Sequence, residues 1–451
     1  MVANSVAEQD VLHEVEPRRF DAVTLLSCYT FLLVLIPSPL IFEPLGAAGS
    51  VAEMFADLIF ICYLIVWLHP ALAPARGYQP VRRAAIAFAC AIIATYVSVN
   101  RHAMPTLELN GADRGIILIC GWLGVMLLAA DGIDSMDRLK VLIRRIVMGA
   151  TAMGVLAAVQ FFTGLNAVAY IVLPGLTRQY AYSDLGTRDA LNRPTSTALT
   201  AIELAAVMAI CLPLAIHQAR FAPPGRRLRC WLQAAVIGAT LPMTVSRTAV
   251  IAIAAVVVVL LPTWTRRERL IAYLVGISSV AVMWATIPGW VGTFTQLFAV
   301  IGSDSSTTSR TGAFQAAAPF IDQHPWLGHG FQTFFPQTYF FTDDQYLLSL
   351  IETGVIGVLA LLGLFATGWF TARSARRMST DPQIRDVAQC LAAALAASAV
   401  SFATFDAFSF SIISGLTFIL LGCIGAVWRL TRTQRLAISV RPDQLVRDPV
   451  H

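Results

Sequence analysis

Twelve apolar runs follow one another along this chain, and they leave very few folds open to it. Crossing a bilayer core takes roughly 20 apolar residues in helical form, and inside it only helices and closed barrels satisfy every backbone polar group. Just 13% of the residues are charged, against about 25% in soluble proteins. The sequence therefore predicts an all-α polytopic membrane protein with about twelve transmembrane helices. The predicted spans are roughly 22–42, 51–68, 84–100, 114–130, 142–163, 196–216, 230–245, 248–264, 270–288, 345–370, 386–403 and 408–428.

The basic residues give this array an orientation. With the N-terminus inside, 25 of the 32 basic residues fall in inner segments, as the positive-inside rule predicts. All of them except Lys140 are arginine, a bias typical of a bacterium with a GC-rich genome. The first 20 residues are polar and contain no cleavable signal sequence. We therefore expect a bacterial plasma-membrane protein with a membrane domain at 22–428 and two cytoplasmic tails, 1–21 and 429–451.

Seven arginines fall in outer segments, where this rule disfavours them: Arg101, Arg114, Arg178, Arg188, Arg193, Arg247 and Arg310. Three of the seven, Arg193, Arg247 and Arg310, sit beside polar residues near a predicted helix end. Arginine suits a bidentate grip on phosphate, so these three are candidate anion-binding residues. Arg247 lies in TVSRTA, where the short seventh and eighth spans meet. The alternative for Arg247 is a side chain that snorkels from a helix end to the interface.

The segment LNRPTSTALTAIELAAV carries polar residues at a helical spacing. Arg193, Thr197, Thr200 and Glu203 fall near i, i+4, i+7 and i+10, so they are expected on one helix face. Glu203 would lie about two turns below the outer surface. A carboxylate inside a membrane is costly and is by default functional. The alternative is a structural glutamate paired with an arginine of a neighbouring helix.

A long outer segment, 289–344, separates the ninth and tenth spans. Within it, SDSSTTSR is rich in residues that begin helices, and TGAFQAAAPFIDQ can form a short helix on the membrane surface. HPWLGHG then ends that helix. Arg310 would stand at the start of this helix, where the macrodipole favours anions. His324 and His329 are candidate hydrogen-bond donors, with ordinary loop residues as the alternative.

The tenth span opens with FTDDQYLL. Thr342 and Gln345 fit a capping box at its start. Asp343 and Asp344 suit a helix N-terminus equally well, because the macrodipole favours negative charge there. The sequence therefore predicts a well-capped helix start, and leaves open whether either aspartate does more than cap it.

A polar stripe descends from this start into the membrane. Gln345, Ser349 and Glu352 are spaced i, i+4 and i+7, and so share a helix face. Glu352 is a second intramembrane carboxylate and a candidate functional residue for the same reason as Glu203. Gly354 and Gly357 follow it and form a small-residue face, which is typical of close packing between membrane helices.

Several functional classes leave no motif in this sequence. It contains no GxGxxG, Walker loop, HExxH or GxSxG, and no clustered histidine and cysteine metal site. The eight cysteines lie in or at the ends of apolar segments without a CxxC pair, which predicts small core residues. We therefore expect no metal, no cofactor and no nucleic-acid partner.

Four stretches taken in order resemble the O-antigen ligase and O-antigen polymerase superfamily. They are NRPTSTALTAIELAAVMAICLPLA, the Ser-Arg break in TVSRTA, SRTGAFQAAAPFIDQHPWLGHGFQTF and DDQYLLSLIETGVIG. The resemblance covers roughly residues 190–365 by motif, and nearly the whole chain by span count and the position of the large outer loop.

This resemblance implies a metal-independent, inverting membrane glycosyltransferase without a cofactor. Such an enzyme moves a glycan from undecaprenyl diphosphate to an acceptor hydroxyl, on a glycan or a lipid, at the outer face of the bilayer. Arg247 and Arg310 match the family's arginines for the diphosphate, and Arg193 is a third candidate. The outer loop 289–344 would form a lid over the active site. His324, His329, Gln345 and Glu203 would support the site.

One departure from the family bears on the activity. The ligases place a histidine, usually followed by Asn, Ser or Gln, where this chain has Asp343 and Asp344. Polymerase-like members more often have an acidic residue there, so a polymerase is favoured over a ligase. Asp343, Asp344 and Glu352 are the candidate catalytic residues. Two other functions remain open: a transporter or flippase of a lipid-linked glycan, and binding of such a lipid without turnover.

Overall fold

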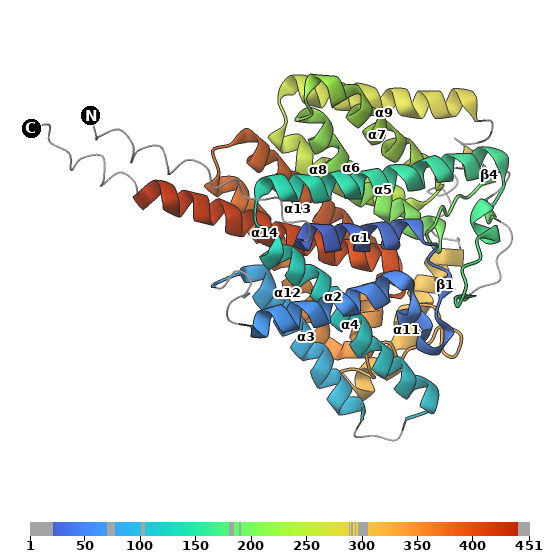
Figure 1. Cartoon of the computed structure of the whole chain (residues 1–451). Coiled ribbons are helices and arrows are strands. Elements are labelled where there is room, and N and C mark those ends of the chain that lie inside the picture. The colour runs from blue at the N-terminus through green and yellow to red at the C-terminus, as the bar shows by residue number, and fades with distance from the viewer. Residues whose placement is uncertain are drawn as a thin grey trace, which may run out of the picture.

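The computed structural model is all-helical, and it describes residues 21–69, 77–100, 104–179, 185–188, 191–287, 289, 292, 293, 295 and 305–440. Its helices, shown in Figure 1, are α1 (Ala22–Leu35), α2 (Val51–Leu68), α3 (Pro80–Val99), α4 (Thr106–Gly132), α5 (Met136–Thr163), α6 (Ala201–Arg220), α7 (Pro224–Met243), α8 (Arg247–Leu260), α9 (Arg266–Thr286), α11 (Ser305–Gln323), α12 (Gln345–Met378), α13 (Pro382–Phe402) and α14 (Ser411–Val440). The structure also contains four short 3-10 turns: η1 (Glu43–Gly49), η2 (Ala167–Tyr170), η3 (Leu261–Thr263) and η4 (Ala407–Ser409).

The chain is a multi-span membrane protein. Within the described part, nine helices are long and apolar enough to cross a bilayer: α2, α3, α4, α5, α6, α9, α12, α13 and α14. The shorter apolar helices are α1 and the α8 segment Arg247–Thr263, while α7 falls on the remaining predicted span. Each of the twelve predicted spans thus contains one helix, but a count of twelve crossings stays a prediction.

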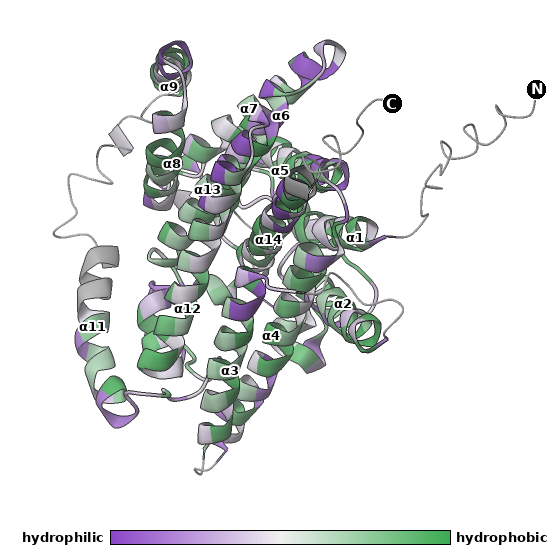
Figure 2. Ribbon diagram, turned by 90° about the vertical axis from the view of Figure 1, so that its left-hand side faces the viewer, coloured by the Kyte–Doolittle hydropathy of each residue, from purple (hydrophilic) through white to green (hydrophobic). Residues whose placement is uncertain are grey.

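The core of the bundle is built around α14. The most apolar window of α14, within Ser411–Leu436, is 94% buried, whereas that of α9 is 6% buried. Next to α14, the indole of Trp122 in α4 stacks between Phe408 at 5.0 Å and Phe418 at 5.3 Å, measured between ring centroids. Figure 2 shows α9 at the periphery of the bundle, with apolar residues along the helices and polar ones mainly near their ends. The apolar character of a helix therefore does not show whether it lies at the centre of the bundle or at its lipid-facing periphery.

The cysteines illustrate this point. Cys211, Cys230, Cys390 and Cys423 are buried, as predicted. The same prediction is wrong for Cys28 and Cys90, which are exposed. A lipid-facing surface is as apolar as a core, so a small apolar side chain fits either place.

Side-chain contacts define two faces of the bundle. The loop face carries the starts of α6, α8, α12 and α14, and Glu203 joins α6 to α14 there by accepting from the N–H of Ile412 at 3.0 Å. The tail face carries the opposite ends, where Nδ1 of His217 in α6 lies 2.7 Å from Oδ2 of Asp386 in α13. Both described ends of the chain, at 21 and 440, lie toward the tail face (Figure 1). The cytoplasmic location of the two tails stays a prediction.

Two short antiparallel strand pairs cover the loop face. β1 (Leu40–Ile41) pairs with β2 (Thr177–Arg178), with Leu40 opposite Arg178. β3 (Thr187–Arg188) pairs with β4 (Leu191–Asn192). The first pair ties the α1–α2 connection to the long connection between α5 and α6, and so encloses the start of α6.

Candidate active site

The start of α12 is held by Asp344. Its Oδ1 accepts hydrogen bonds from two backbone N–H groups of the first turn, at 2.8 and 3.3 Å, which makes Asp344 the N-cap residue. The predicted capping box between Thr342 and Gln345 is therefore wrong. Thr342 instead donates to Oδ1 of Asp406 at 2.6 Å. Gln345 turns into the bundle, where its Oε1 accepts from the N–H of Phe408 at 2.7 Å.

Asp343 is left outside this capping arrangement. Its backbone has a φ of 48°, a left-handed conformation that is uncommon for a residue other than glycine. The side chain is half-buried, and its carboxylate accepts no hydrogen bond from any residue that the structure describes. Strained residues cluster at functional sites. Asp343 is therefore the carboxylate at this helix start whose oxygens the described residues leave unoccupied.

A third carboxylate, Asp406, supports these two from the connection between α13 and α14. It accepts from the hydroxyl of Thr342 and from the backbone N–H of Asp344 at 3.1 Å. Burial raises the pKa of Asp406 to about 6; the Thr342 hydrogen bond opposes this rise, and the negative charge of Asp343 adds to it. Sequence analysis missed Asp406. One feature of the sequence could have identified it: Asp406 is the one acidic residue in the short connection 403–410.

The family-like segments around residues 325 and 355 meet at a break in α12. At Gly354 the backbone leaves the helical conformation, with φ 63° and ψ −169°. A broken helix leaves backbone groups without partners, which is tolerated at membrane depth only where protein satisfies them. The loop 325–330 does so through four hydrogen bonds: His329 N to Ile351 O and Gly330 N to Glu352 O at 2.8 Å each, Val355 N to Pro325 O at 2.9 Å and Ile356 N to Trp326 O at 3.3 Å.

Two glycines make this close approach possible. A Cβ on Gly354 would lie 2.4 Å from the carbonyl of Trp326, and a Cβ on Gly328 would lie 2.3 Å from the carbonyl of Glu352. Both residues also have left-handed backbones, with φ of 63° and 69°. The predicted small-residue face at Gly354 therefore contacts a loop of its own chain.

Glu352 lies directly behind this junction and is 1% exposed. Its Oε1 accepts from the N–H of Phe334 at 3.3 Å. Its Oε2 is buried and has no hydrogen-bond partner among the described residues. The polar stripe predicted from Gln345 to Glu352 therefore faces the interior of the bundle, but Glu352 is screened by the loop 325–334.

The two loop histidines lie beside a buried glutamate from α4. Nε2 of His329 is 3.1 Å from Oε2 of Glu108, and the hydroxyl of Tyr339 donates to the other carboxylate oxygen. Burial, with help from Glu108, raises the pKa of Tyr339 to about 12. His324 lies close by, with its ring centroid 6.1 Å from that of His329. Sequence analysis missed Glu108, because a glutamate in the first turn of a helix is what the macrodipole alone would favour.

The carboxylate of Glu203 is held by backbone N–H groups. It accepts from the N–H groups of Leu199 at 2.9 Å, Ile412 at 3.0 Å and Ile413 at 3.4 Å. It thus caps the start of α14 from a neighbouring helix. The arginine partner considered in the sequence analysis is replaced by backbone N–H groups.

The predicted common helix face from Arg193 to Glu203 is wrong, because α6 begins only at Ala201. Thr200 is its N-cap and accepts from the N–H of Glu203 at 3.2 Å. Thr197 lies before the helix and donates to the carbonyl of Val34 at 2.6 Å. Proline at 194 favours an extended residue before it, and the hydroxyl-rich run that follows favours caps and turns over helix.

The predicted anion-binding arginines approach the junction of α7 and α8. Arg247 is the first residue of α8 and is half-buried, which agrees with the predicted break in TVSRTA. Nε of Arg193 donates to the carbonyl of Thr244, just before that break, at 3.4 Å. Arg310 lies in α11, but its side chain is outside the described part of the chain. The structure therefore brings two of the three arginines to one junction on the loop face.

A cavity of about 250 Å³ opens beside this junction. It lies between the α5–α6 connection and the start of α6, and its lining includes Arg178, Arg193, Ser196 and Thr200. The nearby end of α5 helps to shape it, since Oε1 of Gln160 accepts from the N–H of Ser196 at 2.6 Å. The cavity offers cationic and hydroxyl groups to a ligand.

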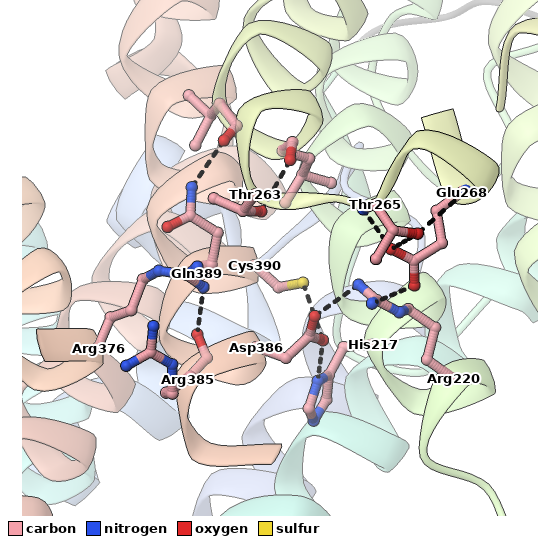
Figure 3. A network of polar contacts seen from close by, with 12 residues as sticks. His217, Arg220, Thr263, Thr265, Glu268, Arg376, Arg385, Asp386, Gln389 and Cys390 are labelled. Atoms are coloured by element: carbon pink, nitrogen blue, oxygen red, sulfur yellow. Dashed lines mark hydrogen bonds and ion pairs between the residues drawn. The ribbon is translucent and has the colours of Figure 1, made fainter. Parts of the chain in front are cut away.

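A second polar network lies at the tail face (Figure 3). Asp386 accepts from Arg220 at 2.6 Å and contacts His217 at 2.7 Å and Sγ of Cys390 at 3.7 Å. Arg220 also donates to Glu268 at 2.6 Å and so reaches the start of α9. The ligand atoms of His217, Asp386 and Cys390 lie within 4.8 Å of one another, a spacing that could hold a metal ion. These contacts already occupy both carboxylate oxygens of Asp386, so we assign the network to anchoring α6, α9 and α13.

A family model described as O-Antigen ligase matches residues 232–362. The matched segment runs from within α7 to beyond the break in α12, and contains Arg247, Arg310, Asp343, Asp344 and Glu352. The resemblance to the O-antigen ligase and polymerase superfamily is therefore confirmed over this segment. No curated protein matches the chain.

Proposed function

We propose that this protein is a cell-envelope polysaccharide polymerase or ligase in a bacterial plasma membrane. It transfers a glycan from undecaprenyl diphosphate to a hydroxyl of an acceptor glycan or lipid. The observation that carries this proposal is the match of residues 232–362 to the O-Antigen ligase model. The loop face is its outer, reacting face, residues 289–344 form its lid, and the tails 1–21 and 429–451 are cytoplasmic.

The donor's diphosphate is held by arginines. Arg193 and Arg247 approach the same helix junction, and Arg310 joins them from the lid. The start of α8 lies at this junction and has no side-chain cap among the described residues, so the positive end of its dipole also favours an anion there. Charge stabilisation of the departing diphosphate is usually the largest single contribution in such a transfer.

Asp343 takes the proton of the acceptor hydroxyl. The acceptor oxygen then attacks the anomeric carbon, and the bond from that carbon to the diphosphate oxygen breaks. The bonding electrons leave with the diphosphate, and the anomeric configuration inverts. Asp344 holds the helix start, while Asp406 receives hydrogen bonds from the residues on either side of Asp343. Glu352 is the next candidate for the base.

A polymerase is favoured over a ligase, because aspartates stand where the ligases have histidine. A metal is not needed when arginines neutralise a good leaving group. The rival is a transporter or flippase of the same lipid. Inverted repeats are typical of many transporters and none is visible in the sequence, while the strained polar residues of the described part gather at one face.

The test is transfer by the purified full-length protein from a lipid-linked oligosaccharide, in excess EDTA. We expect products of increasing length. Arg247→Lys should lose about 10²- to 10³-fold in rate, as for one oriented charge contact, while Arg435→Lys on the tail side of α14 should leave the rate unchanged. Transport without any new glycosidic bond would favour the rival. Activity lost to EDTA and restored by magnesium would contradict the metal-free mechanism.

Deletion in cells separates the two activities. Loss of long surface glycans with single units retained indicates a polymerase, whereas long glycans that remain unattached indicate a ligase. The length distribution of the surface glycan is the measurement.

A further inference from the structure

The cavity beside the start of α6 has hydrogen-bonding capacity that the fold itself does not use. Ser196 lines it and is 1% exposed, and its hydroxyl has no hydrogen-bond partner among the described residues. The backbone of Ser196 is left-handed, with φ 54°, and its N–H is held by Gln160 at 2.6 Å. A buried hydroxyl without a partner is costly, and a strained residue persists only where its surroundings enforce it.

The charge in this cavity is also unbalanced. Arg193 contacts a backbone carbonyl at 3.4 Å, and no carboxylate of the described residues pairs with it. Glu203, in the first turn of α6, is occupied by three N–H groups. Burial lowers the pKa of Arg193, and the positive charge of Arg188 lowers it further. An uncompensated, partly buried guanidinium is stabilised by an anion.

Arg178, which also lines the cavity, is mainly structural. One of its nitrogens donates to the carbonyls of Val168, Ala169 and Ile171 at 3.0 to 3.2 Å, which closes the turn η2. The start of α6 supplies a positive dipole end at the same place. The cavity therefore brings together the guanidinium of Arg193, the hydroxyl of Ser196 and the start of α6.

We infer that this cavity binds an oxyanion of the substrate through Arg193, the hydroxyl of Ser196 and the start of α6. The inference rests on the proposed function, which it extends by adding Ser196 and the cavity itself. Two parts of a lipid-linked glycan carry such a group: the diphosphate, and the carboxylate of an acidic sugar. The diphosphate and the carboxylate would both be bound by the same hydrogen-bond donors.

Calorimetric titration of the purified full-length protein tests the inference, with inorganic pyrophosphate and glucuronate as probes. Binding of pyrophosphate identifies the diphosphate as the occupant, and preferential binding of glucuronate identifies an acidic sugar. Arg193→Gln should weaken binding about tenfold or more, because a hydrogen bond to a charged group is lost. Arg435→Gln removes the same charge on the tail side of α14 and should change nothing. Absence of binding of both probes to the parent would overturn the inference.

Ser196 provides the sharper variant, because no charge changes. Ser196→Ala should weaken binding about three- to tenfold. Ser196→Gly should weaken it equally while it relieves the left-handed backbone, so a folding defect of the alanine variant would not hide the effect. Parent-like binding in both variants would contradict the assignment. Probe binding that depends on Arg193 in a protein without transferase activity would keep the cavity assignment and remove the proposed function.

Discussion

The loop face and the tail face of this bundle differ in how they treat their polar groups. On the loop face stand Ser196, Val245, Gln332 and Asp343, the four non-glycine residues with positive φ in the described part of the chain. On the tail face, Asp386 has its oxygens occupied by neighbouring donors, and Arg82 pairs with Asp131 at 2.8 Å. Left-handed non-glycine backbones of the described part thus lie at one end, and ion pairs that join helices lie at the other. This difference supports the proposal that the substrate binds at the loop face, while the ion pairs of the tail face join helices.

The largest effect that tests this contrast is expected for Asp343→Asn. Asparagine tolerates the left-handed backbone but cannot take a proton, so the rate should fall about 10²- to 10³-fold at an unchanged unfolding midpoint. Transfer assays and thermal unfolding of the purified protein measure both.

Asp344→Asn is the matched control, because asparagine caps a helix as well as aspartate does, and its rate should change little. Asp343→His should recover part of the lost activity. A parent-like rate for Asp343→Asn would move the base to Glu352.

On the tail face the opposite pattern is expected. Asp386→Asn weakens charged hydrogen bonds to Arg220 and His217, and should lower the free energy of unfolding by about 2 kcal/mol. The rate per folded molecule should stay the same.

Asp381→Asn on the same helix is the control, since Asp381 only caps α13, through a 2.7 Å contact to the N–H of Gln383, and asparagine keeps that cap. If Asp386→Asn instead lowered the rate at parental stability, the division between the two faces would fail.

A smaller effect is expected from Asp406, because burial raises the pKa of its carboxyl from the ordinary value of 3.8 to about 6. Between these values the folded protein binds more protons than the unfolded chain. Its contribution to stability is therefore fully present below about pH 4 and is lost as pH rises to about 6, with a slope of at most about 1.4 kcal/mol per pH unit. Unfolding midpoints of the parent and of Asp406→Asn across this range should differ in slope. Parallel curves would show that Asp406 does not titrate there.

The smallest effect is expected for Asp344→Ala. This change removes the acceptor of two N–H groups at the start of α12, and should cost about 1 kcal/mol of stability. It would show that the loop face contributes to stability through its caps. A loss of several kcal/mol would mean that Asp344 also holds the connection to Asp406.

Much of the fold could be predicted because the apolar runs are long and separated by basic or polar breaks. The break before Arg247 is an example, since Ser246 and Arg247 are too polar to continue the apolar span. Helix starts were less predictable: Thr342 and Asp344 both fit the cap of α12. Asp406, which is distant in sequence, accepts a hydrogen bond from the hydroxyl of Thr342. Asp344 is therefore the residue that caps α12.

The partners of the candidate site could not be predicted for a similar reason. Glu108 and His329 lie in separate helical and loop segments, and only the packed bundle brings them to 3.1 Å. Glu203 was expected to pair with an arginine, but backbone N–H groups of α14 reach it first. Spacing reveals neighbours along one helix, while carboxylates in a bundle are satisfied across helices.

The hydrogen bonds between the loop 325–330 and the break at Gly354 also bear on the order in which the protein is made and inserted. The ribosome completes this loop before α12 emerges, so the partner of the broken helix is already synthesised when the helix enters the membrane. The backbone N–H and C=O groups at the break would be costly to expose to acyl chains. Contacts between segments that are close in sequence form early. We therefore expect the loop and α12 to leave the insertion machinery as one hairpin, before α14 arrives to fill the centre of the bundle.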